Sequence, residues 1–380
     1  MRFVLVLVTW GSNDILIWEK FGRHIAEWGV LEEYVRTPAF NHPPLMGSWS
    51  ELCFEVGRST FVPFRIAFKL LPLTTDVLCT WGIWRVVRRQ RGTLAAWRAA
   101  AVFSTCLVSI LITGFHGNTD STCAATAFLA TALVAEGRSP LLAGIALGAA
   151  LNVKLIPLVL LPGLFLQLRD LRTMARFSLG LALALLPLAV PAVMVKDAFY
   201  SNVIAYNSMP ERWGIHFLLD SFAVLTPWTD SVRRIDEGFG HLARFAILAS
   251  SLGIGAWARW HRRTAFEVTA LVFAMFLVLA PGIGVQYLIY AVPALVIVDL
   301  RRAVLYGTVA GLFLGAVYSS FLTGDFPIRS WHRPGIPIGT ALIGLGAWLA
   351  LVELLITRLF FSKPESSPLS GGVRTTDDLC

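Results

Sequence analysis

The first candidate for chemistry is Asp14, which directly follows a short apolar run over 1–10. A carboxylate at the end of an apolar segment can accept a proton from a substrate hydroxyl and act as a general base. The structural alternative is a helix cap, because the Ser, Asn and Asp at 12–14 all suit the position before a helix that begins at Ile15. The spacing alone leaves both interpretations open.

His42 stands directly before Pro43 and Pro44, at the start of the next apolar segment. The two prolines fix an extended approach to a helix. A histidine at this position could bind a phosphate or orient an acid. The alternative is an interfacial histidine without a ligand.

Asn118, Asp120 and Lys154 are polar residues next to long apolar segments. Asn118 and Asp120 belong to a run of small polar residues that suits a helix N-terminus. Lys154 is the only charged residue between Pro140 and Leu168. A lysine in such surroundings must reach the membrane surface, pair with an acid, or bind an anion such as a phosphate. An ion pair with Asp120 is therefore the structural alternative to phosphate binding.

Gln286 and Tyr287 follow a Gly- and Pro-interrupted segment that begins at Pro281. They offer hydrogen bonds near the end of an apolar segment, although a tyrosine there often serves only as an aromatic anchor. The sequence contains no P-loop, GxGxxG, HExxH or GxSxG motif in a suitable context, which argues against an ATP-driven pump.

The composition defines the class of protein to which these residues belong. Of 380 residues, 56% are hydrophobic and 15% are charged, whereas soluble domains carry about 25% charged residues. The mean hydropathy is +0.66. A soluble chain of this kind would expose more apolar surface than it could bury, which excludes a soluble enzyme, a disordered chain and a nucleic-acid-binding module. The class that remains is a polytopic membrane protein.

Apolar segments recur along the chain and predict an all-α fold, because lipid offers no partner to unpaired backbone groups. We expect roughly 11–13 transmembrane helices, several of them short or interrupted. The segments run over 1–10, 44–57, 70–87, 95–113, 119–135, 139–152, 154–168, 176–195, 243–258, 265–281, 285–299, 302–322 and 336–359. One transmembrane domain over 1–360 is expected, followed by a Ser-, Pro- and Gly-rich disordered tail over 361–380.

Arginine supplies nearly all of the positive charge behind the net charge of +8, and the arginines gather in clusters. The clusters are Arg85/Arg88/Arg89/Arg91/Arg98, Arg169/Arg172/Arg176, Arg259/Arg262/Arg263 and Arg301/Arg302. Even numbers of predicted spans separate them, so all can face the cytoplasm together. The large loop 196–242 is then extracytoplasmic. The large loop 11–43 joins it only if 44–87 crosses the membrane an odd number of times.

Taken together, the motifs resemble the GT-C superfamily of membrane glycosyltransferases. They are most similar to glycosyltransferase family 87 proteins and to the catalytic subunit of GPI mannosyltransferase I. The matching order over about 10–295 is Asp14 after the first helix, His42-Pro43-Pro44-Leu45, Thr75-Asp76-Val77-Leu78 with Trp84-Arg85, Gly117-Asn118-Thr119-Asp120-Ser121, Val153-Lys154-Leu155-Ile156-Pro157 and Gln286-Tyr287-Leu288. Each motif is short, and it is the ordered set that is specific.

The resemblance implies a transfer reaction on the extracytoplasmic side of a bacterial plasma membrane. The donor would be a polyprenyl- or dolichyl-phosphate sugar, a hexose or pentose with mannose favoured, and the acceptor a lipid or glycan. Asp14 takes the position of the general base for an inverting, single displacement at the anomeric carbon. No resident cofactor and no metal-binding residue is implied. A divalent metal ion stays open, because Asn13 stands beside Asp14 where several such enzymes carry a second acid.

A lipid-linked phosphate needs nearby cations, and its sugar needs aromatic and hydrogen-bonding partners. The candidate phosphate ligands are Lys154, His42, Arg212 and His216. The candidates for binding or supporting the sugar are Trp18, Asn118, Asp120, Trp213, Gln286 and Tyr287. The rival function is a transporter or lipid flippase without covalent chemistry, favoured by the interrupted segments near 152–157 and 281–285. Membrane lipids are expected partners in both cases and nucleic acid in neither, and the oligomeric state is open.

Overall fold

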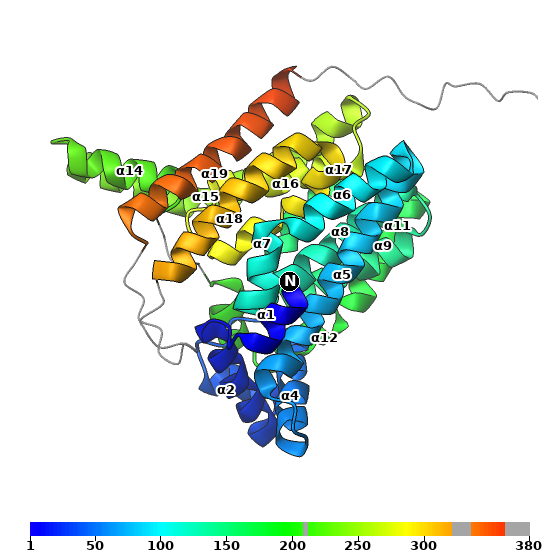
Figure 1. The fold of residues 1–380 in the computed structure, drawn as a ribbon, viewed down its shortest axis with the longest axis vertical. Coiled ribbons are helices and arrows are strands. Elements are labelled where there is room, and N and C mark those ends of the chain that lie inside the picture. The colour runs from blue at the N-terminus through cyan, green and yellow to red at the C-terminus, as the bar shows by residue number, and fades with distance from the viewer. Residues whose placement is uncertain (207, 209–211, 321–335, 362–380) are drawn as a thin grey trace, which may run out of the picture.

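The computed structural model describes residues 1–206, 208, 212–320 and 336–361, and over these residues the chain forms helices and no strand (Figure 1). The predicted fold class, an all-α polytopic membrane protein, is confirmed. The predicted tail over 361–380 lies outside the described residues from 362 onward.

The helices follow one another with short connections. Up to residue 165 they are α1 (Arg2–Val8), α2 (Asn13–Trp28), α3 (Val30–Arg36), α4 (Pro44–Ser59), α5 (Phe64–Arg91), α6 (Thr93–Thr105), α7 (Leu107–Ile110), α8 (Asp120–Glu136), α9 (Pro140–Val153) and α10 (Leu160–Phe165). From residue 171 they are α11 (Leu171–Ala184), α12 (Leu186–Met194), α13 (Lys196–Phe199), α14 (Gly214–Leu225), α15 (Thr229–Trp260), α16 (Ala265–Leu279), α17 (Val292–Val298), α18 (Leu300–Ser320) and α19 (Ile338–Ile356). Short π- or 3₁₀-helical segments are η1 (Leu111–His116), η2 (Ile156–Val159), η3 (Tyr200–Ile204), η4 (Val285–Ile289) and η5 (Thr357–Phe361).

Four helical segments are long and apolar enough to cross a membrane: α5, α15, most of α18, and α19 continued by η5. Two bent pairs qualify together, α6 with α7 and η1, and α11 with α12, with bends of 47° and 54°. Other apolar helices are shorter than a span; α9 has 14 residues and is about 21 Å long. The chain is an integral membrane protein whose apolar segments include several that are shorter than a full crossing.

The N-terminal part of the fold differs from a simple row of spans. The run over 1–10, expected as a short first membrane helix, forms α1, which has 7 residues and is too short to cross. Segment 44–87 holds one qualifying span, α5, while α4 packs against α2. A single crossing by α5 is an odd number of crossings, which is the condition for loop 11–43 to lie on the side away from the arginine clusters. In Figure 1, α2 and α4 project together from the end of the bundle opposite α6 and α17.

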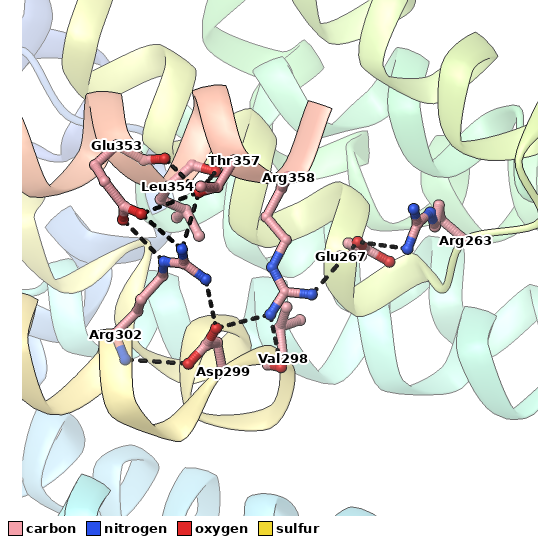
Figure 2. Close-up of polar contacts among 9 residues, drawn as sticks. All are labelled: Arg263, Glu267, Val298, Asp299, Arg302, Glu353, Leu354, Thr357 and Arg358. Carbon is pink, nitrogen blue, oxygen red and sulfur yellow. Dashed lines mark hydrogen bonds and ion pairs between the residues drawn. The ribbon is translucent and has the colours of Figure 1, made fainter. Parts of the chain in front are cut away.

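An ionic network joins the ends of α16, α18 and α19 (Figure 2). Arg302 pairs with Asp299 at 2.8 Å and with Glu353 at 2.6 Å, and Arg358 pairs with Asp299 at 2.8 Å. Glu267 of α16 extends this network, because its carboxylate lies 3.9 Å from Arg358 and 3.5 Å from Arg263. The two C-terminal arginine clusters therefore lie together.

The other two clusters lie at the same end of the bundle. Arg89 of α5 pairs with Glu136 at the end of α8 at 2.8 Å, and a hydrogen bond joins the C-terminal half of α8 to the first turns of α16. Arg259 of α15 donates to the carbonyl oxygens of Leu166 and Leu168 at 3.2 and 3.1 Å, next to the cluster that begins at Arg169. We call this end of the bundle the basic end.

The second large loop, predicted over 196–242, is largely helical where it is described. It contains α13, η3 and α14, and α15 begins inside it at Thr229. The predicted span over 243–258 is therefore the C-terminal half of a 32-residue helix. The charged first half continues the helix because arginine and glutamate are good helix formers and an acid in the first turn is favourable.

Candidate active site

Asp14 lies in the first turn of α2, where its carboxylate meets the turn between η1 and α8. Its Oδ2 accepts a hydrogen bond from Asn118 Nδ2 at 2.7 Å and lies 3.2 Å from His116 Nε2. Asn118 and His116 are buried, whereas the Asp14 side chain keeps 35% exposure. Within the described part of the chain, Oδ1 accepts no hydrogen bond. One carboxylate oxygen is thus held and the other is available to a substrate.

The helix cap is made by Ser12 and not by the Asp14 carboxylate. Ser12 Oγ accepts a hydrogen bond from the backbone N–H of Asp14 at 3.2 Å. The backbone N–H of Ser12 donates to the carbonyl oxygen of His116 at 3.4 Å, which ties the start of α2 to the end of η1. The Asp14 side chain is therefore free for the contacts described above.

The two partners of Asp14 are themselves held in place. Asn118 Oδ1 accepts a hydrogen bond from the backbone N–H of Asp120 at 3.1 Å, which leaves Nδ2 facing Asp14 and His116. The His116 ring stacks on Tyr318 of α18, with centroids 5.3 Å apart and planes 16° apart. Its Nε2 lies 3.2 Å from both Asp14 Oδ2 and Asn118 Nδ2, and the tautomer with the proton on Nε2 is the one in which the ring donates to Asp14. The carboxylate thus meets pre-positioned donors.

These donors decide the charge of Asp14. Burial alone raises the pKa of Asp14, but His116, Asn118 and the Lys154 ammonium together lower it well below its usual range. The carboxylate is ionised throughout the physiological pH range. An ionised carboxylate with one free oxygen is the state that a general base needs.

Lys154 follows the last turn of α9, and its ammonium forms an ion pair with Asp120. The distances from Nζ to the two carboxylate oxygens are 2.9 and 3.2 Å. Tyr290 donates to Asp120 Oδ1 at 2.7 Å, and Lys154 Nζ lies 4.5 Å from the centre of the Tyr287 ring. The side chain of Lys154 is 13% exposed and that of Asp120 is fully buried. The pair that the sequence offered as the structural alternative is therefore formed.

His42 lies near both Asp14 and Lys154. Its ring packs against Trp18 at a centroid separation of 4.4 Å. Burial and the charge of Lys154 lower the pKa of His42 to about 3, against the opposing effect of Asp14. The ring is neutral at physiological pH, so it can offer a phosphate an N–H group but no positive charge.

The segment η4 holds Gln286 and Tyr287 at the other side of Lys154. Tyr287 OH lies 2.8 Å from Ser208 Oγ. Gln286 is half-buried and folds over Gly284, where an added Cβ would be 2.8 Å from Gln286 Nε2. Tyr287 thus borders the ion pair directly, while Gln286 makes no hydrogen bond within the described residues.

Arg212 and His216, expected as phosphate ligands, are engaged elsewhere. Arg212 is exposed and donates to the carbonyl oxygen of Ile336 at 2.9 Å. His216 of α14 pairs with Asp236 of α15 at 2.6 Å. Among the described residues, neither side chain contacts the Asp14 or Lys154 groups, because Arg212 is held by the segment before α19 and His216 by α15.

Trp18 and Trp213, expected to stack on a sugar, are each only 2% exposed. Trp18 packs between Phe68, at a centroid separation of 5.2 Å, and the His42 ring. Trp213 donates from Nε1 to the carbonyl oxygen of Leu277 at 2.8 Å. Both indoles are buried in packing contacts, so neither presents a ring face to a sugar.

Two side chains of the site were not among the predicted site residues, because neither shows a sequence signal as strong as an isolated charge in an apolar segment. His116 holds Asp14, and Tyr290 holds Asp120. The signal for His116 is its place directly before a glycine turn that also carries Asn118; Tyr290 lies in an apolar run and shows none. Among the described residues, no three His, Cys, Asp or Glu side chains are grouped to hold a metal ion.

The fold and the site define an integral membrane protein with a charged cluster at one end of its helical bundle, opposite the basic end. Comparison with known families assigns its chemistry. The sequence model of glycosyltransferase family 87 matches residues 59–281, and the chain belongs to this family. It is a membrane glycosyltransferase, with a sugar donor and an acceptor as substrates. The match includes Asn118, Asp120 and Lys154, and Asp14 precedes it. No curated protein and no solved structure matches the chain.

Proposed function

We propose that this protein transfers a hexose or pentose, with mannose favoured, from a polyprenyl-phosphate donor to a lipid or glycan acceptor, inverting the anomeric centre. The observation that carries the proposal is the Asp14 carboxylate, ionised, with Oδ2 held by Asn118 and His116 and Oδ1 unoccupied. The family assignment supports a glycosyltransferase reaction at this site. The donor, the sugar and the stereochemistry rest on the resemblance and on this geometry.

In the proposed reaction Asp14 acts as the general base. Its Oδ1 accepts the proton of the acceptor hydroxyl while the hydroxyl oxygen attacks the anomeric carbon. The bond between that carbon and the phosphate oxygen breaks, and the lipid phosphate leaves with the electron pair. Since Asp14 is a weak base in the ground state, the proton moves as the new bond forms, and the protonated carboxyl later returns it to solvent.

Lys154 is the cation we assign to the donor phosphate. Its ammonium is partly exposed and acts on the charge of Asp14. Two of its contacts are with Asp120, so a phosphate would join an existing ion pair. His42 supplies a neutral N–H group to the same region, whereas Arg212 and His216 make contacts elsewhere.

We infer the side of the membrane on which the reaction takes place from the positions of the arginine clusters. The arginine clusters lie together at the basic end, and positively charged ends of membrane bundles favour the cytoplasm. Asp14 and Lys154 lie at the start of α8, the end opposite to the one where Glu136 pairs with Arg89 at the basic end. We therefore assign the reaction to the extracytoplasmic side, in a bacterial plasma membrane as the resemblance implies.

The donor class is tested with purified protein in lipid nanodiscs. We expect transfer of labelled sugar from a polyprenyl-phosphate hexose or pentose to a lipid or glycan acceptor, and none from nucleotide sugars. Transfer only from nucleotide sugars would contradict the proposed donor. Flux of a lipid-linked sugar across proteoliposomes without any transfer would favour the transporter or flippase.

The pH dependence offers a second test, with His116→Phe. Phenylalanine keeps the stacking on Tyr318 but removes the ring nitrogen that lowers the pKa of Asp14 most. The pKa of Asp14 then rises, a larger fraction is protonated at acid pH, and activity is lost there. We expect the acid limb of the pH–rate profile to move upward by about one unit or more. An unchanged acid limb would mean that Asp14 is not the titrating base; Glu136→Gln at the basic end is the control.

A further inference from the structure

Lys69 of α5 is fully buried and belongs to none of the ion pairs within the described residues. Its Nζ donates to the carbonyl oxygen and to Oγ1 of Thr9, both at 3.1 Å, and to the carbonyl oxygen of Gly114 at 3.4 Å. These neutral acceptors use the three protons of the ammonium. A buried cation without an acid partner is costly inside a membrane protein, and a functional reason for it is the default expectation.

The oxygen atoms that accept hydrogen bonds from Lys69 belong to Thr9 and Gly114, the first residues of the two segments that form the Asp14 site. Thr9 ends α1 and leads through Gly11 to Asp14. Gly114 lies in η1, two residues before His116. One ammonium thus bridges the segment that carries the carboxylate and the segment that carries its donors.

The glycines of the two segments close around the stem of Lys69. Gly11 and Gly117 have φ angles of +97° and +70°, which side chains rarely adopt. A Cβ added at Gly117 would lie 2.7 Å from Lys69 Cε, and one at Gly11 would lie 3.2 Å from the same atom. Both turns pack closely against the lysine, so its aliphatic stem as well as its ammonium holds the two turns in position.

We propose that Lys69 is a positioning residue that clamps the 9–14 segment to the 114–118 segment, so that Asn118 and His116 meet the Asp14 carboxylate. The catalytic consequence rests on the proposed role of Asp14 as the base. Lys69 is buried beneath the two turns, and we assign it no contact with substrate.

The test compares Lys69→Met with Arg65→Met in nanodiscs. Arg65 lies one turn earlier on α5 and donates to the carbonyl oxygens of Leu7 and Thr9, both at 3.1 Å, but makes no contact with the 114–118 segment. Hydrogen–deuterium exchange reads the clamp without requiring activity. We expect Lys69→Met to raise exchange in both segments. Arg65→Met should raise it only near residues 7–10, where Arg65 also lies over the Trp10 ring, and not in the 114–118 segment.

The kinetic readout separates positioning from folding. We expect Lys69→Met to lower kcat by about 10- to 100-fold with little change in the KM for donor, because a displaced base loses rate and not binding. Arg65→Met should keep kcat. Exchange unchanged in either segment, or equal kcat losses in both variants, would overturn the clamp.

Gly117→Ala tests the same clamp if Lys69→Met does not accumulate. Its methyl group would press on the lysine stem and on Ile15 of α2, so exchange should rise at Thr9, which the lysine contacts and Ile15 does not cover; no rise there would overturn the proposal. If the wild-type protein transfers no sugar, the proposed function fails while the exchange measurements still decide the clamp.

Discussion

Asp14→Asn should abolish sugar transfer, with a fall in kcat of about 10³-fold, while the protein still accumulates in the membrane. General-base catalysis contributes on the order of 10²- to 10⁴-fold, and asparagine cannot take up the acceptor proton. The cap of α2 is made by Ser12 with the backbone of residue 14 and survives the change. The measurement is the initial rate with labelled donor, together with the unfolding temperature in detergent.

The matched control for this variant is Glu27→Gln, which removes a carboxylate from the exposed face of the same helix. It should leave the rate and the unfolding temperature unchanged. Retention of more than a tenth of the wild-type kcat by Asp14→Asn would remove Asp14 as the base. The carboxylate to test next would then be Asp120, whose role in the present account is to hold Lys154.

Asp120→Asn should be strongly destabilising. It leaves the ammonium of Lys154, 13% exposed, without its charge partner, and breaking a buried pair in this way costs about 3–5 kcal/mol. Lys154→Met should cost a similar amount, because it strands a fully buried carboxylate. The measurement is the free energy of unfolding, or the unfolding temperature, of the purified variants.

The double variant Asp120→Asn/Lys154→Met separates stability from substrate binding. Replacing both charges removes the stranded partner, so most of the lost stability should return. If Lys154 binds the phosphate, the KM for donor should lie above the wild-type value in Lys154→Met and should remain so in the double variant. Stability losses that simply add in the double variant would contradict a coupled pair, and a wild-type KM would remove Lys154 from the phosphate site.

The parts of the site that the sequence predicts are those where a scarce charge interrupts apolar residues. Asp120 stands at the start of α8 and Lys154 directly after α9, and these ends of two consecutive helices meet at the same end of the bundle. Their ion pair was one of the interpretations that the sequence left open, and it is formed in the structure. Asp14, on a separate helix, reaches the same turn through Asn118.

Other features depend on tertiary packing that a single sequence does not display. Trp18 and Trp213 have the residue type for sugar stacking, but packing buries their rings. Lys69 is a charge within the segment 44–87 whose partners, oxygen atoms of Thr9 and Gly114, belong to remote segments. The extension of α15 into the 196–242 loop escapes a hydropathy pattern because its first half is polar yet helical.

The most direct test of the account is the anomeric configuration of the product. Wild-type protein is given a polyprenyl-phosphate sugar of one defined anomer, and the new glycosidic bond is assigned by NMR. A single displacement with Asp14 as base predicts the opposite anomer in the product. A product that keeps the configuration of the donor would contradict the direct attack of the acceptor hydroxyl at this site.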